Sequence, residues 1–114
     1  MKPSDEIVSE KKAQMRRGLL EFCILLAISD GRAYSSDILK KLKDADLLVV
    51  EGTLYPLLSR LRAQELVAYD WEESKSGPPR KYYELTRHGR ETLLNLQKTW
   101  KELHRSIITL EDAK

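Results

Sequence analysis

The sequence predicts a mainly α-helical fold with one small β-hairpin, which places the chain in the α+β class. Two observations lead to this prediction. Apolar residues recur at helical spacing in four separate segments of the 114-residue chain. Between the third and fourth segments, two short stretches alternate apolar and polar residues on either side of Gly77, Pro78 and Pro79, as strands joined by a loop do. Hydrophobic residues make up 41% of the chain, enough for one packed domain.

The first helix is predicted over residues 13–29. Apolar residues cover it nearly all round, so we expect it to be buried on most sides. Residues 1–11 are polar and form either a loose arm or the start of this helix. The only cysteine, Cys23, excludes an intramolecular disulfide and is interpreted as a small core residue.

A second helix, capped by Ser35 or Ser36, is predicted to end near Ala45. The third helix spans residues 50–63, and its leucines form one stripe at i, i+3, i+4 and i+7. Pro56 is tolerated only in a first turn, so this helix should start near Gly52 or Thr53, with Thr53 as its cap. Two short helices joined by a short turn indicate a helix-turn-helix.

The other side of the third helix combines small, hydroxylic, aromatic and basic residues and carries no acidic residue. Its members are Tyr55, Pro56, Ser59, Arg60 and Ala63. This composition is typical of a helix that lies against DNA. The alternative is a surface helix that merely covers the core.

Two strands are predicted at residues 66–71 and 80–86, joined into a hairpin whose tip carries Lys75, Arg80 and Lys81. Beside a helix-turn-helix, such a hairpin makes a winged helix. The net charge of +2 is too small to indicate nucleic acid, but between Lys75 and Arg90 the only acidic residue is Glu84. The basic tip therefore suits the DNA backbone or a minor groove. The alternative is a hairpin that only packs, with a tip that is basic for solubility.

The last helix is predicted from Thr86 to about Leu110, and it carries a seam of apolar residues spaced 3, 4, 3, 4 and 3 apart. This seam predicts a homodimer interface, because so long a helix overhangs a small core. The alternative is that it folds back onto the first helix. The predicted interface residues are Leu93, Leu96, Trp100, Leu103, Ile107 and Leu110. Residues 1–88 would form the DNA-binding unit and residues 87–114 the dimerisation helix, within one structural domain.

Catalysis has little support in the sequence. His88 and His104 are the only histidines, and with a single cysteine they make no metal-ligand cluster. No glycine-rich phosphate loop is present. We therefore expect no catalytic residue, no metal and no cofactor. No apolar run approaches the ~20 residues that span a bilayer, and no signal peptide opens the chain, so we expect a cytoplasmic protein.

Three stretches resemble the PadR family of bacterial transcriptional regulators, in its small single-domain subfamily: MRRGLLEFCILLAI (15–28), EGTLYPLLSRL (51–61) and SGPPRKYYELTRHG (76–89). The resemblance implies a dimeric winged-helix repressor that is associated with the nucleoid when bound to DNA. It assigns Thr53 and Tyr55 to the recognition helix, Arg80 and Lys81 to the wing, and the dimer contact to the last helix. One departure is Glu65, where members usually have glycine; a left-handed helix cap at Glu65 would be strained.

The resemblance also suggests an effector. Some members respond to phenolic acids or to hydrophobic, often cationic, drugs, and an aromatic residue of the last helix then lines a pore between subunits. Trp100 corresponds to that residue, and Met15 is the second candidate for ligand binding. The alternative is that Trp100 is simple dimer core.

The sequence thus predicts a homodimeric repressor that binds a pseudo-palindromic operator and is released by a hydrophobic or aromatic small molecule. The alternative is a winged-helix adaptor that binds other proteins and no DNA. The predicted DNA contacts are Thr53, Tyr55, Ser59, Arg60, Lys75, Arg80 and Lys81.

Overall fold

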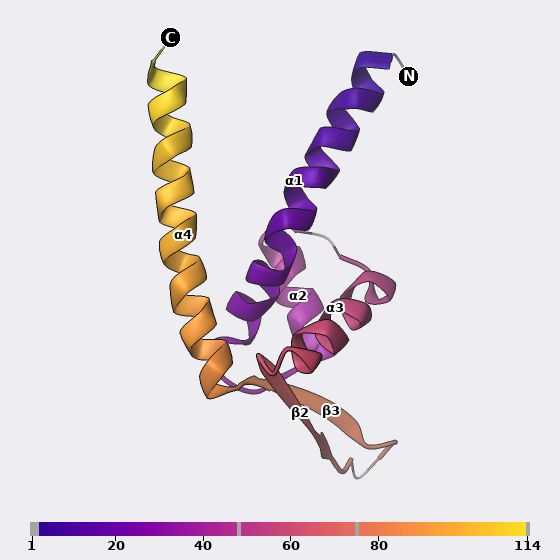
Figure 1. The fold of residues 1–114 in the computed structure, drawn as a ribbon. Coiled ribbons are helices and arrows are strands. Elements are labelled where there is room, and N and C mark those ends of the chain that lie inside the picture. The colour runs from indigo at the N-terminus through magenta and orange to yellow at the C-terminus, as the bar shows by residue number, and fades with distance from the viewer. Residues whose placement is uncertain (1–2, 48, 75, 114) are drawn as a thin grey trace.

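A computed structural model describes residues 3–47, 49–74 and 76–113 (Figure 1). The four helices are α1 (Pro3–Ile28), α2 (Ser35–Asp44), α3 (Glu51–Ala63) and α4 (Arg87–Asp112). The three strands are β1 (Ala33–Tyr34), β2 (Val67–Glu72) and β3 (Arg80–Leu85). The mainly helical winged-helix fold is therefore confirmed. Lys75, predicted to contact DNA, lies outside the described residues.

The sheet has three strands rather than the two of the predicted hairpin. All pairs are antiparallel, in the order β1-β3-β2. β1 consists of two residues, too few for an alternation pattern to be visible in the sequence. In the β2–β3 hairpin, hereafter the wing, Tyr69 pairs with Tyr83 and Trp71 with Lys81. These four side chains therefore share the face of the sheet on which Val67 and Leu85 are buried.

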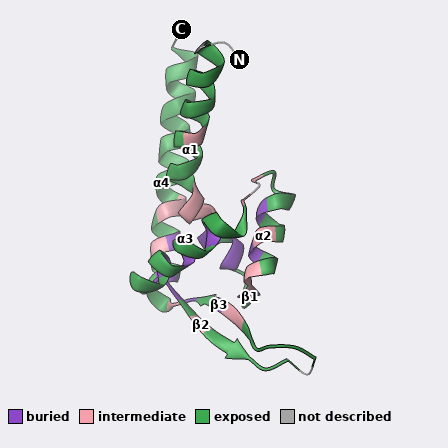
Figure 2. Ribbon diagram, turned by 90° about the vertical axis from the view of Figure 1, so that its right-hand side faces the viewer, coloured by how far each residue is buried: buried purple, intermediate pink, exposed green. Residues whose placement is uncertain are grey.

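The core lies where the C-terminal end of α1 meets α2, α3 and the sheet. Figure 2 shows the buried residues gathered there, whereas the distant ends of α1 and α4 are exposed. The stripe on α3 is confirmed, since Leu54, Leu58 and Leu61 are fully buried and Leu57 packs against them. Complete burial of a leucine side chain contributes about 1.5–3 kcal/mol, so this stripe fixes α3 to the core.

The start of α3 differs from the prediction. The helix begins at Glu51 with Val50 as its N-cap, so Thr53 is the third helical residue and not the cap. Pro56 is the sixth residue and lies inside the helix. Because proline has no N–H, the carbonyl of Gly52 receives no helical hydrogen bond at this point, but the buried leucines keep the turn helical.

The start of α2 also differs. Neither Ser35 nor Ser36 caps the helix; Tyr34 occupies the N-cap position without a side-chain cap bond of its own. Instead, the Asp37 carboxylate accepts a hydrogen bond of 3.0 Å from the Tyr34 N–H. One backbone donor is thereby satisfied from inside the first turn, which is half of a capping box.

α2 and α3 end in the same way, with an acidic residue in the left-handed region. At the end of α3, Glu65 has φ 62°, the Leu66 N–H donates to the Leu61 carbonyl (3.0 Å), and the Glu65 N–H donates to that of Arg62 (2.9 Å). This is a Schellman motif, which glycine usually completes. A side chain in this conformation costs about 1–2 kcal/mol. The strain expected at Glu65 is therefore present, and Asp46, with φ 61°, repeats it after α2.

The first turn of α4 is fixed against the end of α3. Thr86, the predicted start of this helix, is its N-cap: its hydroxyl accepts from the Gly89 N–H (2.9 Å) and donates to the Glu65 carbonyl (2.6 Å). Gly89 is buried, and a Cβ atom at this position would lie 1.9 Å from the Leu66 carbonyl oxygen. Only glycine allows the helix to approach the chain this closely.

α1 and α4 extend beyond the core as two arms whose free ends carry the chain termini (Figure 1). The described polar segment from Pro3 onward belongs to α1, so it is the start of the helix rather than a loose arm. The expectation that α1 is buried on most sides is wrong. Its exposed apolar residues are Ile7, Val8, Met15, Leu19 and Leu26. None of the helices in the described part of the chain is long and apolar enough to cross a membrane.

The seam predicted on α4 is partly used within the protomer. Leu93 is 5% exposed and belongs to the core of its own chain, so it is not open to a partner as predicted. Leu96 is partly buried against the same core. The remaining members of the seam are exposed: Trp100, Leu103, Ile107 and Leu110.

Candidate nucleic-acid interface

The outward side of α3 has two flanks with different surroundings. Thr53 and Arg60 lie seven residues apart and share one flank. Both line a cavity of about 510 Å³ that α3 forms with α1. Tyr55 lies on the opposite flank, toward the wing and the start of α2. Ser59 is exposed between the flanks. The four predicted DNA contacts of α3 therefore do not form a single cluster.

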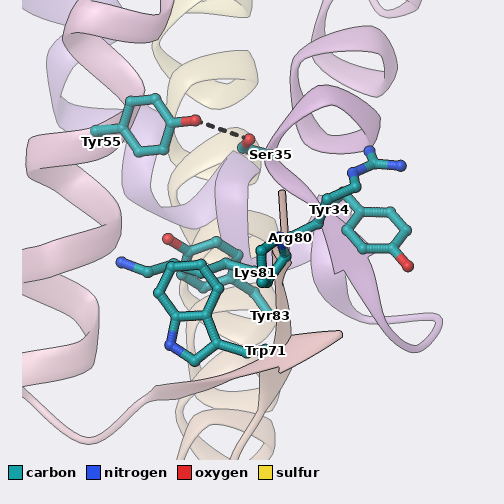
Figure 3. A pocket seen from close by; sticks show the side chains of 8 residues that line it. Tyr34, Ser35, Tyr55, Trp71, Arg80, Lys81 and Tyr83 are labelled. Carbon is teal, nitrogen blue, oxygen red and sulfur yellow. Dashed lines mark hydrogen bonds between the residues drawn. The ribbon is translucent and has the colours of Figure 1, made fainter. Parts of the chain in front are cut away.

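A cavity of about 360 Å³ separates α3 from the wing (Figure 3). Four aromatic rings and two cations line it, together with one serine and one proline. The lining residues are Tyr34, Ser35, Tyr55, Trp71, Pro79, Arg80, Lys81 and Tyr83. The structure thus brings together three of the predicted contacts, Tyr55, Arg80 and Lys81. None of the described residues that line the cavity carries a carboxylate, so it suits an anionic ligand.

The position of Tyr55 is fixed by a bond to the other helix of the helix-turn-helix. Its hydroxyl lies 3.0 Å from the Ser35 Oγ (Figure 3). Tyr83 forms part of the cavity wall and is 5% exposed, and burial raises the pKa of its phenol. Tyr55 remains half exposed, so its ring presents both an apolar surface and a polar tip.

Both cations of the wing lie over aromatic rings. The Arg80 guanidinium lies 3.8 Å from the centroid of the Tyr34 ring, and its NH2 donates to the Ser36 Oγ at 3.2 Å. The Lys81 ammonium lies 4.3 Å from the Tyr69 centroid and 5.3 Å from that of Trp71. Cation–π contacts hold the charges at the surface without neutralising them, so they stay available to phosphate.

Tyr34 and Trp71 line this cavity but are not among the contacts predicted from the sequence. The Trp71 side chain is 56% exposed and faces the cavity. The register of the hairpin contains the signal, because Trp71 pairs with Lys81 and therefore shares its face. No comparable signal marks Tyr34, whose place follows from the two-residue strand β1.

On its other flank, α3 is linked to α1 by an ion pair. Arg60 Nε lies 3.4 Å from Glu21 Oε1. This carboxylate oxygen is buried, and among the described residues it accepts no hydrogen bond, so the contact with Arg60 is purely electrostatic. The Arg60 side chain is 67% exposed and can still reach solvent.

The remaining candidate residues lie away from this interface. His88 is exposed at the start of α4, and His104 stacks on Trp100 with ring centroids 5.5 Å apart. Cys23 is half-buried and packs against the core instead of belonging to it, and this burial raises the pKa of its thiol. In the part of the chain that the structure describes, no three His, Cys, Asp or Glu residues gather as a metal site would require. Met15 and Trp100, the predicted ligand contacts, are both exposed, on α1 and α4 respectively.

Comparisons with known proteins agree with this architecture. The family model described as the transcriptional regulator PadR-like family matches residues 24–95. The chain is 52% identical to a PadR-like transcription factor from Bacteroides fragilis, covering 89% of this chain and 98% of that one, with a TM-score of 0.77. A PadR family regulator from Eggerthella lenta is 33% identical, with 97% of both chains covered and a TM-score of 0.87.

A more distant structure shares the fold. PadR of Bacillus subtilis, solved in complex with operator DNA, is 21% identical to this chain. The match covers 69% of this chain and 46% of that one, with a TM-score of 0.64.

Proposed function

The chain belongs to the PadR-like family of transcriptional regulators, and from this premise we propose that it is a homodimeric repressor of a pseudo-palindromic DNA operator. The observation that carries the proposal is the cavity between α3 and the wing. Aromatic and cationic side chains from β1, α3 and both wing strands line it, and no carboxylate is among these described lining residues. Such surfaces combine phosphate binding with apolar contacts to sugars and bases.

In the proposed complex, α3 enters the major groove and the wing contacts the flanking backbone. Tyr55 reads bases or sugars, and Arg80 and Lys81 bind phosphates. The other proposed contacts are Thr53, Ser59, Arg60 and Lys75. The B. subtilis PadR structure with operator DNA supports this arrangement by its shared fold. Two copies of α3 would meet half-sites about 34–36 Å apart, one turn of the duplex.

The homodimer is proposed from the open apolar faces of the two arms. On α1, Met15, Leu19 and Leu26 share one face, and Ile24 lies on the opposite, buried face. On α4 the proposed contacts are Leu96, Trp100, Leu103, Ile107 and Leu110. Contiguous apolar surface of this extent seldom stays in water, and a second copy of the chain offers a matching surface. Residues 87–114 would thus serve dimerisation, and residues 1–88 would serve DNA binding.

An effector site is proposed at the same arms. Trp100 on α4 and Met15 on α1 expose an indole and a thioether, both of which suit a planar hydrophobic molecule. Ligand binding should quench the fluorescence of Trp100 when Trp71 is replaced by phenylalanine, so that only one indole remains. If Trp100→Ala changes neither the ligand affinity nor the release of DNA, the proposal of an effector site at Trp100 is wrong.

The experiment that tests the function is selection of bound duplexes from a random DNA pool at near-physiological salt. A repressor enriches a two-fold-symmetric motif with half-sites one helical turn apart. Enrichment of no sequence, with salt-sensitive binding to every duplex, would contradict operator recognition. Complete absence of DNA binding would favour the alternative, a winged-helix adaptor for other proteins.

A further inference from the structure

Five side chains connect the loop end of the wing to the start of α2. Arg32 NH2 lies 2.7 Å from the Glu72 Oε2, and the Tyr34 hydroxyl donates a hydrogen bond to the same oxygen. The Tyr34 ring in turn stacks against Arg80, which also donates to Ser36. Glu72 and Arg80 are register partners on β2 and β3. These contacts tie the wing to the helix-turn-helix where β1 contributes only two residue pairs.

The carboxylate of Glu72 would repel DNA if it pointed freely along the wing. Two donors on the β1 side, Arg32 and Tyr34, hold it away from the cavity, and Glu72 is not among the residues that line that cavity. The hydrogen bond to Glu72 raises the pKa of the Tyr34 phenol, so the hydroxyl remains a donor at neutral pH.

The ring of Tyr34 determines where the charge of Arg80 lies. A guanidinium 3.8 Å from a ring centroid is restricted to the space above that ring, and the bond to Ser36 adds a second restraint. Arginine has five N–H donors, so several remain for a phosphate. They lie beside the first turn of α2, whose free N–H groups also favour an anion. Arg80 is therefore held ready for binding instead of being ordered by the DNA.

We propose that Tyr34 is a positioning residue for DNA binding: its hydroxyl is anchored by Glu72, and its ring fixes Arg80 against one operator phosphate. This inference rests on the proposed DNA binding. It adds a residue outside the predicted contacts, and it explains why an acidic side chain occurs opposite Arg80 at the loop end of the wing. A fixed cation pays less conformational entropy on binding than a mobile one.

The test is a double-mutant cycle on DNA affinity, with Tyr34→Leu and Arg80→Ala in the full-length chain. Tyr34→Leu should weaken binding about tenfold, consistent with a cation–π contact near the upper end of its range. In the Arg80→Ala background the same change should have almost no effect, because the residue that Tyr34 positions is gone. Tyr34→Phe keeps the ring and loses only the bond to Glu72, so it should weaken binding by about threefold instead of tenfold.

Two controls make the cycle specific. Lys81→Ala serves as the matched background, since Lys81 contacts Tyr69 and Trp71 rather than Tyr34; there the effect of Tyr34→Leu should remain tenfold. Tyr82→Phe removes a neighbouring hydroxyl for which the described residues provide no hydrogen bond, and it should leave DNA affinity unchanged. If Tyr34→Leu does not fold, the cycle of Tyr34→Phe with Arg80→Ala replaces it, with about threefold coupling expected.

Equal losses from Tyr34→Leu in the wild-type and Arg80→Ala backgrounds would overturn the proposal, because they would indicate a general structural role. The proposed function fails in a different way: the wild-type protein would then bind every duplex without preference, or would bind no DNA at all. The two failures are therefore distinguished before any variant is compared.

Discussion

Glu21 Oε1 lies 3.4 Å from Arg60 Nε, so a buried carboxylate oxygen of α1 faces a cation on the flank of α3. The pair joins the helix proposed to read DNA to the helix proposed to form dimers. Because Arg60 is mostly exposed, it can exchange this partner for a DNA phosphate.

We expect Glu21→Gln to strengthen binding to random-sequence DNA by about threefold, since an amide holds Arg60 less firmly and leaves it for phosphate. The slope of log K against log salt should steepen by up to ~0.9, which corresponds to one additional phosphate contact. Titration at several salt concentrations measures both. The matched control is Glu91→Gln, which breaks a pair with Arg87 at the same 3.4 Å distance but on α4. If Glu21→Gln leaves the affinity for random-sequence DNA unchanged, Arg60 does not contact a DNA phosphate.

Tyr55→Ala should weaken binding to the selected operator more than binding to random DNA, by a ratio of about tenfold, since each direct base contact contributes about 1–3 kcal/mol. Tyr55→Phe separates the two parts of the side chain. It keeps the ring and loses only the bond to Ser35, so a smaller loss is expected. Competition binding with labelled operator gives the ratio. Equal losses on both DNAs would exclude Tyr55 from base recognition.

Leu103→Glu should convert the dimer to a monomer, because it places a charge in the proposed apolar seam of α4. Leu94→Glu is the control, since Leu94 is also an exposed leucine of α4 but lies off the seam. Size-exclusion chromatography with light scattering reports the mass of each variant. A monomeric wild type, or a dimeric Leu103→Glu protein at micromolar concentration, would contradict the seam.

Gly89→Ala should destabilise the fold by about 3 kcal/mol, because the new methyl group would overlap the Leu66 carbonyl and the backbone must shift. Gly18→Ala provides the contrast. Gly18 lies inside α1 with open space around it, so alanine there should stabilise the helix by up to ~1 kcal/mol. Chemical denaturation compares the free energies of unfolding. Similar stabilities for the two variants would refute the close approach of α4.

The pair between Asp30 and Lys41 predicts a pH dependence of stability. Lys41 Nζ donates to Asp30 Oδ1 at 2.6 Å, and this contact holds the pKa of the carboxyl below its usual value. A lowered folded-state pKa stabilises the protein above the unfolded-state pKa, about 4 for aspartate, and this stabilisation is lost as the pH falls through the folded value. The difference in melting temperature between wild type and Asp30→Asn should therefore shrink as the pH falls from about 5 to about 2. A difference that is constant with pH would argue against the pair.

Much of the fold follows from periodicity alone. The leucine stripe of α3 and the alternation of the wing strands are strong signals because each buries a complete face, and both segments were predicted close to their observed bounds. The last helix also begins within one residue of the predicted Thr86, which serves as its N-cap.

The parts that the sequence did not reveal depend on contacts between distant residues. Pro56 suggested a helix start near Gly52 or Thr53, but α3 begins at Glu51 and packing of the buried Leu54 and Leu58 holds the proline inside the helix. Leu93 matches the seam by spacing, yet the position of α4 on the core decides that it is internal. Tyr34 gains its place near Arg80 only because β1 pairs with β3. Local patterns do not record such pairings.

α1 packs on the core with one face and is proposed to contact the partner subunit with the other, so the helix can transmit a movement between the dimer interface and the winged helix. At 1.5 Å per residue its 26 residues form a rod of about 39 Å. If the core end acts as the pivot, a tilt of about 5° displaces the free end by about 3 Å, by the same helical rise. In the proposed dimer the reverse also holds: repacking of the arms by a few ångströms rotates each winged helix by a few degrees. The distance between the two α3 helices of the dimer would then no longer match the pitch of the duplex.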